Sequence, residues 1–343
     1  MRTQLSSLFC GALFISSLTF CWPRLAIQAN AQNLTQLNVQ MAEVDSTKLP
    51  ALIAADEGIF KKNGLAVNLY ITTGARDTSL RRDVHIPEQF VRDDRTAPIV
   101  MAGSFGFARI SYDAGHNPDS VMIATLDPMI HWKIVGNKDI AGLEGLKVKR
   151  LAINPRAETE LIARALIQQT HWDPLFDIAL LNATPDLVTL RSGLVDAIIA
   201  AEIPEAVAVA NGYHVIFDTS VWKVPIPGAG INTTRSWLKN NHVTAIRFVR
   251  SIVEGIALMR KDRELAYRSI AKWYNITDPT YLKFIYDGTR DMERKPYPNI
   301  EGVKTVMKLY DSLEMRKHKP EEFYDDSVMR EVDTNGFIES LYK

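Results

Sequence analysis

Residues 37–71 constrain the fold most strongly, because they place a helical pattern between two strand patterns. Residues 37–41 alternate apolar and polar side chains, as a half-buried strand does. Residues 49–60 have apolar side chains at helical spacing and lead to Gly64, a helix-stop residue, and residues 65–71 have strand character again. A strand, a helix and a strand in this order predict a parallel sheet and therefore an α/β fold.

Strand patterns and helix patterns continue to alternate along the chain. A Pro/Gly-rich segment at 225–230 is typical of a boundary between lobes. Helical stripes follow from Trp237, and the charge-rich stretch 76–95 is expected to be a solvated surface excursion. The pattern predicts strands at 98–102, 121–124, 133–135, 146–148, 151–153, 179–181, 197–200 and 215–217, and helices at 107–115, 154–170 and 184–192.

Composition and spacing exclude several classes of function. The chain has 40 basic and 40 acidic residues, so it lacks the positive field that nucleic-acid binding needs. Its seven histidines are far apart, without His-x-His or His-x-x-x-His pairs, and no GxGxxG or P-loop occurs. We therefore expect no metal, no cofactor and no nucleic acid.

The first 31 residues have the pattern of a secretion signal. Arg2 is followed by a nearly uncharged stretch, and Ala29-Asn30-Ala31 has the small-x-small form of a cleavage site. A membrane anchor is disfavoured because the apolar stretch is shorter than the roughly 20 residues that a bilayer requires. Both cysteines, Cys10 and Cys21, lie in this segment, and a lipid anchor on Cys21 is the alternative. We expect cleavage near Ala31 and a periplasmic product.

Ser104 is the one candidate nucleophile. It lies in Ala102-Gly103-Ser104-Phe105-Gly106, between an apolar strand and an expected helix, which is the setting of a nucleophile elbow. No glycine-rich oxyanion segment precedes it, and His214, His242 and His318 have no distinctive setting. A ligand-binding turn is the favoured interpretation, and a serine hydrolase is the alternative.

Other polar residues follow expected strands. With Asn154 as N-cap, the free N–H groups of Arg156, Ala157 and Glu158 would face an anion. Glu202 and Asp127 each follow a strand and would face a ligand or cap a local turn. Trp132 and Phe105 are candidates for stacking on a ligand. An anionic or zwitterionic small organic ligand is therefore expected.

Three segments carry a family resemblance. In residues 49–67 the spacing of Pro50, Ala54, Gly58, Gly64 and Val67 resembles the opening segment of the substrate-binding proteins of ABC importers of the nitrate/sulfonate/taurine and thiamine-precursor type. Residues 143–148 resemble the start of that family's second lobe, and residues 192–197 resemble one of its strands. The chain departs from the family pattern at 97–100 and 154–157, so the family's best-known ligands are not carried over.

The resemblance implies a two-lobed type II periplasmic-binding-protein fold with a ligand cleft and a helical C-terminal tail. Lobe 1 would comprise 32–128 and 229–343, and lobe 2 would comprise 129–228, with hinge crossings near 125–133 and 224–232. By position, the cleft would be lined by Gly74, Ala75, Gly103, Ser104, Asp127, Arg156, Ala157, Glu158, Thr159 and Glu202.

These observations predict a non-enzymatic, monomeric solute-binding protein. Its partners would be a small-molecule ligand and an ABC permease in the inner membrane. A sensory ligand receptor with the same fold is a further alternative, which the sequence leaves open.

Overall fold

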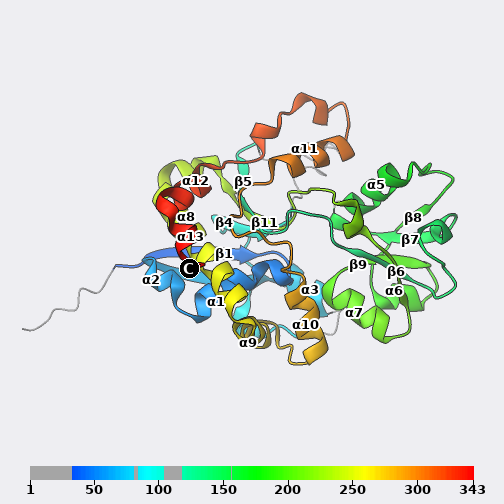
Figure 1. The fold of residues 1–343 in the computed structure, drawn as a ribbon, viewed down its shortest axis with the longest axis horizontal. Helices are drawn as coiled ribbons and strands as arrows, with labels where there is room; N and C mark the ends of the chain where they lie inside the picture. Colours follow the sequence, from blue (N-terminus) through cyan, green and yellow to red (C-terminus); the bar gives the residue numbers. More distant parts are fainter. Residues whose placement is uncertain (1–32, 81–83, 104–117, 156) are drawn as a thin grey trace, which may run out of the picture. The chain divides into compact units, whose positions relative to one another are not determined.

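The computed structural model describes residues 33–80, 84–103, 118–155 and 157–343 (Figure 1). Residues 34–343 form one compact unit, and the architecture below is that of this unit. This unit contains two mixed β-sheets with helices packed on them, which confirms the α/β class.

The first sheet has the strand order β3-β2-β1-β4-β11-β5. Strands β1, β2, β3 and β4 run parallel, and β11 is antiparallel to both β4 and β5. The predicted strand–helix–strand unit is therefore real. The strands are β1 (Thr35–Met41), β2 (Leu65–Thr72), β3 (Val91–Arg92), β4 (Ile99–Ala102), β5 (Ser120–Thr125) and β11 (Gly230–Thr234).

The second sheet has the strand order β10-β6-β9-β7-β8. Strand β7 is parallel to β8 and β9, whereas β6 is antiparallel to β9 and β10. Its strands are β6 (Lys133–Gly136), β7 (Arg150–Ile153), β8 (Ala179–Asn182), β9 (Ala197–Ala200) and β10 (His214–Asp218).

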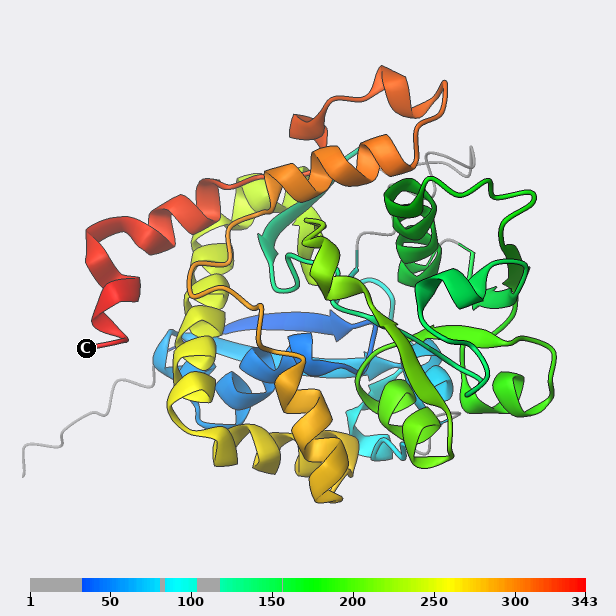
Figure 2. The ribbon, with the colours of Figure 1, turned by 45° about the vertical axis from the view of Figure 1, so that its right-hand side comes forward.

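Helices occupy the connections and most of the C-terminal third. Figure 2 shows the long helix α8 crossing the first sheet, where it packs on α1. The α-helices are α1 (Leu49–Asp56), α2 (Ile59–Lys62), α3 (Thr73–Leu80), α5 (Glu158–Thr170), α6 (Leu187–Arg191), α7 (Glu202–Ala210), α8 (Arg235–Lys261), α9 (Arg263–Tyr274), α10 (Pro279–Asp287), α11 (Ile300–Leu309), α12 (Ser327–Asp333) and α13 (Phe337–Ser340). Short 3-10 turns are η1 (Ser46–Lys48), η2 (Glu88–Phe90), η3 (Leu143–Leu146), η4 (Thr219–Trp222), η5 (Met315–Lys317), η6 (Pro320–Glu322) and η7 (Thr334–Gly336).

Four predicted elements differ from the structure. The helix expected over 49–60 is two helices, because Gly58 takes a left-handed φ of 69° between them. Residues 146–148 form no strand, and Val148 has a φ of 58°. The stretch 76–95 includes most of α3, all of β3 and the buried Val84 and Ile86, so it is more than a surface excursion. The helix predicted at 154–170 begins only at Glu158. The helix predicted at 107–115 lies outside the described residues.

Apolar side chains from these helices build separate cores. The predicted stripe of α8 (Val249, Ile252, Val253 and Ile256) is fully buried in the core of the first sheet. The core of the second sheet takes in side chains from β6, β7 and α5, and also Val303 and Val306 from α11. Figures 1 and 2 both show α11 beside α5, so part of the C-terminal tail packs against the second sheet.

The two segments that connect the sheets run side by side. The Ile130 N–H donates to the Val224 carbonyl at 3.0 Å, and the Ile226 N–H donates to the Pro128 carbonyl at 2.9 Å. The Asn299 amide, at the start of α11, donates to the carbonyls of Pro128 at 2.8 Å and Ile226 at 3.0 Å. These hydrogen bonds hold the predicted crossing segments together.

Gly228 is required for this close pairing. A Cβ at Gly228 would lie 2.4 Å from the Asp127 carbonyl oxygen, a backbone atom with little freedom to move. We expect Gly228→Ala to lower the free energy of unfolding by about 1–3 kcal/mol through overpacking, measured by urea denaturation. Gly74→Ala is the matched control, because no atom lies within 4 Å of its Cβ position. Equal stability of the two variants would contradict the tight pairing.

Candidate functional site: a cleft at the strand ends

A cavity of about 650 Å³ lies where strands of both sheets end. It is lined by residues that follow β1 and β2 in the first sheet and by residues that follow β7, β8 and β9 in the second. Open α/β sheets bind ligands beyond the carboxyl ends of their strands, where loops and helix starts converge. The cavity is therefore the candidate ligand site.

Most of the site residues predicted from the sequence line this cavity. Gly103 is not part of the lining, although its N–H donates to Glu43 Oε1 at 3.0 Å at the edge of the cavity. Ser104, Phe105 and Arg156 lie outside the described residues. The predicted residues that line the cavity are Gly74, Ala75, Asp127, Trp132, Ala157, Glu158, Thr159 and Glu202.

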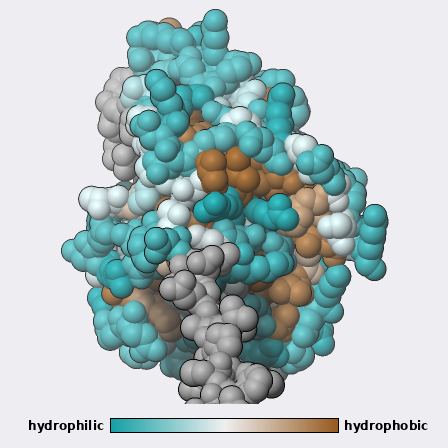
Figure 3. Space-filling view, turned by 90° about the vertical axis from the view of Figure 1, so that its left-hand side faces the viewer, coloured by the Kyte–Doolittle hydropathy of each residue, from teal (hydrophilic) through white to brown (hydrophobic). Residues whose placement is uncertain are grey.

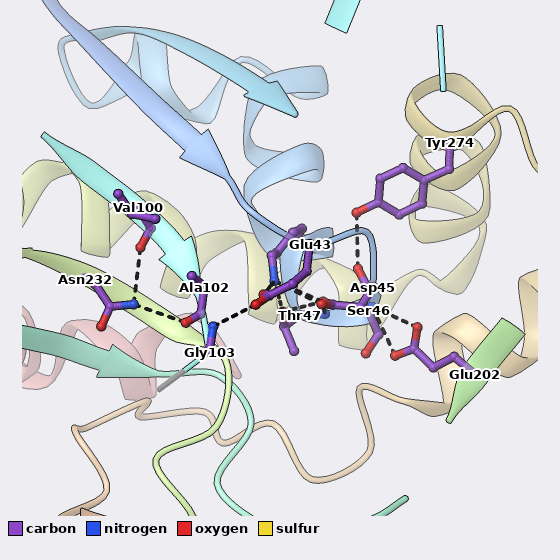
Figure 4. A network of polar contacts seen from close by, with 11 residues as sticks. Glu43, Asp45, Ser46, Thr47, Val100, Ala102, Gly103, Glu202, Asn232 and Tyr274 are labelled. Carbon is purple, nitrogen blue, oxygen red and sulfur yellow. Dashed lines mark hydrogen bonds and ion pairs between the residues drawn. The ribbon is translucent and has the colours of Figure 1, made fainter. Parts of the chain in front are cut away.

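A buried ammonium group organises the loop that follows β1. Figure 4 shows the polar contacts around this loop. Lys48 is fully buried, and its Nζ lies 2.8 Å from Glu43 Oε2, 3.0 Å from Asp45 Oδ2 and 2.9 Å from Thr47 Oγ1. One ammonium group thus forms ion pairs with two carboxylates and donates hydrogen bonds to three side chains.

The pKa shifts follow from this cluster. Burial alone would raise the pKa of the Asp45 carboxyl, but the Lys48 ammonium and the hydrogen bonds from Thr47 outweigh it and lower the pKa. Burial would likewise lower the pKa of Lys48, but Asp45 and Glu43 raise it above its ordinary value. Asp45 and Lys48 are therefore both ionised at neutral pH.

Glu202 links the second-sheet side of the cleft to the first. It opens α7 with a left-handed φ of 51°, a conformation that costs a residue other than glycine about 1–3 kcal/mol. Its carboxylate oxygens accept the Ser46 N–H at 3.1 and 3.2 Å. Burial and the Asp45 charge raise the pKa of Glu202 to about 8. Glu202 therefore both starts a helix and faces the cleft, the two roles that the sequence left open.

Asp127 forms an ion pair in the wall of the cleft. Its Oδ1 lies 3.2 Å from Nδ1 of His131. Burial alone would lower the pKa of His131, but the attraction and hydrogen bond of Asp127 and the charge of Glu202 raise it to about 10. His131 is thus a charged partner for Asp127 rather than a free base.

The start of α5 differs from the predicted anion site. Asn154 does not cap the helix: its N–H donates to the Thr159 hydroxyl at 2.9 Å, and the N-cap is Ala157. The Ala157 N–H is already bonded to the Asn154 carbonyl at 3.1 Å. The first turn carries the carboxylates of Glu158 and Glu160, so acidic side chains stand where an anion was expected.

Sequence reasoning missed the residues that follow β1. Glu43, Asp45 and Ser46 line the cleft, yet they fall in a segment interpreted only as a polar loop; Gln40 lines it from the end of the predicted strand. The signal that could have found them is the one that found Asp127 and Glu202, an acidic residue directly after a strand. His131 was missed because it had no histidine or cysteine neighbour at metal-ligand spacing.

The three histidines considered as partners for Ser104 have other partners. His214 Nε2 lies 3.1 Å from the Ile140 carbonyl, His242 Nε2 lies 2.7 Å from Glu331, and His318 Nδ1 lies 2.8 Å from Glu322. Each ring is therefore engaged in local structure, which disfavours the hydrolase alternative.

Metal clusters and membrane-spanning helices are both absent from the described part of the chain. Within it, no three His, Cys, Asp or Glu side chains are grouped to hold a metal ion. No described helix has both the length and the apolar character needed to cross a membrane. Figure 3 shows one face on which hydrophilic side chains surround a hydrophobic area, and a mixed surface of this kind is ordinary for a folded domain.

Comparisons with solved structures identify the fold. The periplasmic aliphatic sulphonate-binding protein SsuA from Escherichia coli superposes with a TM-score of 0.60 and 16% identity, over 89% of this chain and 96% of that one. The periplasmic nitrate-binding protein NrtA from Synechocystis PCC 6803 superposes with a TM-score of 0.64 and 12% identity, over 87% of this chain and 88% of that one. The desulfurization enzyme DSZB superposes with a TM-score of 0.57 and 10% identity, over 90% of this chain and 99% of that one. No protein-family model and no curated protein matches the sequence.

The chain therefore has the fold of the periplasmic binding proteins. The resemblance to substrate-binding proteins of ABC importers is confirmed at the level of the fold. Because an enzyme shares this fold, the arrangement of strands does not itself decide between binding and catalysis.

We expect removal of the buried ammonium to destabilise the protein. Lys48→Met leaves Glu43 and Asp45 without their shared cation, which costs about 3 kcal/mol in the free energy of unfolding measured by urea denaturation. Lys147→Met is the control: Lys147 pairs with Glu144 on the surface, where such pairs contribute about 0–1 kcal/mol. Similar losses in both variants would show that the Lys48 cluster adds no more than a surface pair.

The raised pKa of Glu202 predicts a pH-dependent stability. Between pH 4.5 and 8 the folded protein holds the Glu202 proton more tightly than the unfolded chain, so raising the pH through this window favours unfolding. The free energy of unfolding of Glu202→Gln, relative to that of wild type, should therefore rise by about 2 kcal/mol between pH 5 and pH 8.5. This is less than the full pKa shift would give, because the carboxyl group is only half-buried and solvent screens it.

Denaturant unfolding at both pH values measures this difference. The control is Glu301→Gln, an exposed residue that should follow the wild-type curve. A Glu202→Gln curve parallel to wild type across this range would contradict the assigned shift.

Proposed function

We propose that this chain is an extracytoplasmic solute-binding protein that captures a small organic molecule and delivers it to an ABC-type permease. The observation that carries the proposal is the cavity of about 650 Å³ at the strand ends of two sheets whose connecting segments are paired side by side. A cavity of this size suits a small molecule, and paired crossings form a hinge about which two lobes can close.

Several observations support the transport role. The superposed structures include binding proteins named for sulphonate and nitrate. The N-terminal pattern is that of a secretion signal cleaved near Ala31, which suits a periplasmic protein. We propose a monomer. We also propose that it has no nucleic-acid partner, because its 40 basic residues are balanced by 40 acidic ones.

We also propose the lobe boundaries expected from the sequence, 32–128 with 229–343 and 129–228. The first-sheet strands fall in the former ranges and the second-sheet strands in the latter. Helix α11 packs on the second core although it belongs to the C-terminal range. The hinge would therefore include the Asn299 contacts along with the two crossings.

The proposed ligand is a zwitterion rather than a simple anion. The sequence favoured an anionic or zwitterionic ligand, with Arg156 and the helix start as the positive side of the site, but the first turn of α5 is acidic. A zwitterion brings a cationic group that carboxylates can bind, whereas a simple anion would meet them with like charge.

Ligand capture is tested by thermal shift and small-angle scattering. A chemically diverse panel of metabolites is screened, and a compound at about 100 times its Kd should stabilise the protein by about 2.7 kcal/mol. The same compound should reduce the radius of gyration as the lobes close. Failure of every compound in the panel to stabilise the protein would contradict a solute-binding role.

The hydrolase alternative is tested with p-nitrophenyl acetate. We expect the wild-type protein to hydrolyse it no faster than the Ser104→Ala variant. Turnover that requires Ser104 would overturn the binding-only function.

A further inference from the structure

The charges that line the cleft are unbalanced. Among the described lining residues there are two cationic side chains, His131 and Arg95, and five acidic ones: Glu43, Asp45, Asp127, Glu158 and Glu202. His131 is paired with Asp127, and Lys48, which is not part of the lining, is paired with Glu43 and Asp45. Arg95 is exposed to solvent, where its charge is screened.

Two of these carboxyl groups, Glu202 and Glu158, have no ion pair within the described residues. Glu202 accepts the Ser46 N–H. The Glu158 side chain has no hydrogen bond there either, although Glu158 is half-buried at the start of α5. Its Oε1 lies 2.8 Å from the position that a Cβ on Gly103 would take, and Glu43 Oε1 lies 3.5 Å from the same point. Two carboxylates from opposite sides of the cleft thus converge at Gly103.

Electrostatics at this point favour an added positive charge. Burial and then the charges of Glu43, Asp127 and Asp45 raise the pKa of the Glu158 carboxyl well above its ordinary value. Lys48 opposes this rise, but it sits on the other oxygen of Glu43, away from the Gly103 N–H. A cation placed between Glu43 and Glu158 would offset the repulsion that contributes to the raised pKa of Glu158.

Two buried oxygen atoms provide an independent indication. Ser46 is 1% exposed, and its Oγ has no hydrogen-bond partner; the same holds for the buried Oε1 of Gln40. Both residues line the cleft. A buried polar atom without a partner is costly, and both atoms can accept a hydrogen bond. Ser46 Oγ lies near Gly288 and Glu202, so a ligand rich in N–H donors would satisfy both atoms only if it extends from the Glu43–Glu158 side of the cleft to the Glu202 side.

We propose that the cleft recognises a protonated nitrogen group, an ammonium, amidinium or guanidinium, seated between Glu43 and Glu158. The inference rests on the proposed solute-binding function and adds the charge of the recognised group. A zwitterion meets this requirement for a protonated nitrogen through its cationic end, and a purely anionic ligand does not.

The test uses compounds of one shape and different charge. Benzamidine, benzamide and benzoate form one set, and pentylamine, pentanol and valerate form another, alongside the metabolite panel. Binding is measured by isothermal titration calorimetry at pH 7.5. We expect the cation of each set to bind at least tenfold more tightly than its neutral and anionic counterparts, and the metabolite hits to be cations or zwitterions.

Two variants separate the site from general charge effects. Glu158→Gln should weaken binding of the cations at least tenfold and leave binding of the neutral compounds unchanged. Glu144→Gln is the same substitution at a surface position outside the cleft, and it should leave the affinity for every compound unchanged. Tighter binding of anions, or cation binding that survives Glu158→Gln, overturns the inference while leaving solute binding intact. Absence of binding by all compounds overturns both.

The pH dependence gives a second readout. Glu158 faces Glu43, Asp45 and Lys48 from the loop after β1, and Asp127 from the crossing segment. A cation needs the ionised carboxylate, so binding of benzamidine should strengthen as the pH rises from 5.5 to 7.5, with release of a proton. The slope should flatten in Glu158→Gln. Affinity that falls over this range would overturn the inference.

Discussion

The Lys48 ammonium is the interaction on which the geometry of the cleft depends. It fixes Glu43 and Asp45 in the loop after β1, and that loop then makes the other contacts. Glu43 accepts the Gly103 N–H after β4, the Asp45 carbonyl accepts the Tyr274 hydroxyl, and the Ser46 N–H reaches Glu202 in α7. One buried charge thereby positions three strand-end segments and the end of α9. A neutral side chain at this position would leave the two carboxylates to repel each other.

The fold could be predicted from the sequence because its signals are local. The period-two pattern at 37–41 and the helical stripe of α8 depend on which side chains face a core, and both were right. The errors have local causes that a pattern does not show. Gly58 splits a helix by its positive φ, and Asn154 was given a cap role because of its residue type, although its own N–H is bonded by Thr159. Caps and breaks depend on backbone angles, which side-chain periodicity does not report.

The site could be predicted only in part, because its chemistry arises from residues distant in the sequence. Glu202 and Asp127 could be found, since each directly follows a strand. That Glu158 converges with Glu43 at Gly103 depends on how the two sheets are placed, and no spacing in the sequence encodes it. The fold does not determine the ligand class either, because proteins named for sulphonate, nitrate and desulfurization share it. The ligand class therefore has to be argued from charge and burial.

The distribution of carboxylates between the lobes also bears on closure. Glu43 belongs to the first-sheet side and Glu158 to the second, so closure of the proposed lobes would bring two acidic side chains together. A ligand shifts an equilibrium between open and closed forms only through its different affinity for them. The proposed protonated nitrogen would interact with both carboxylates in a closed form and with one in an open form. The repulsion that would disfavour an empty closed cleft would thus be the same interaction that makes a bound cation favour closure.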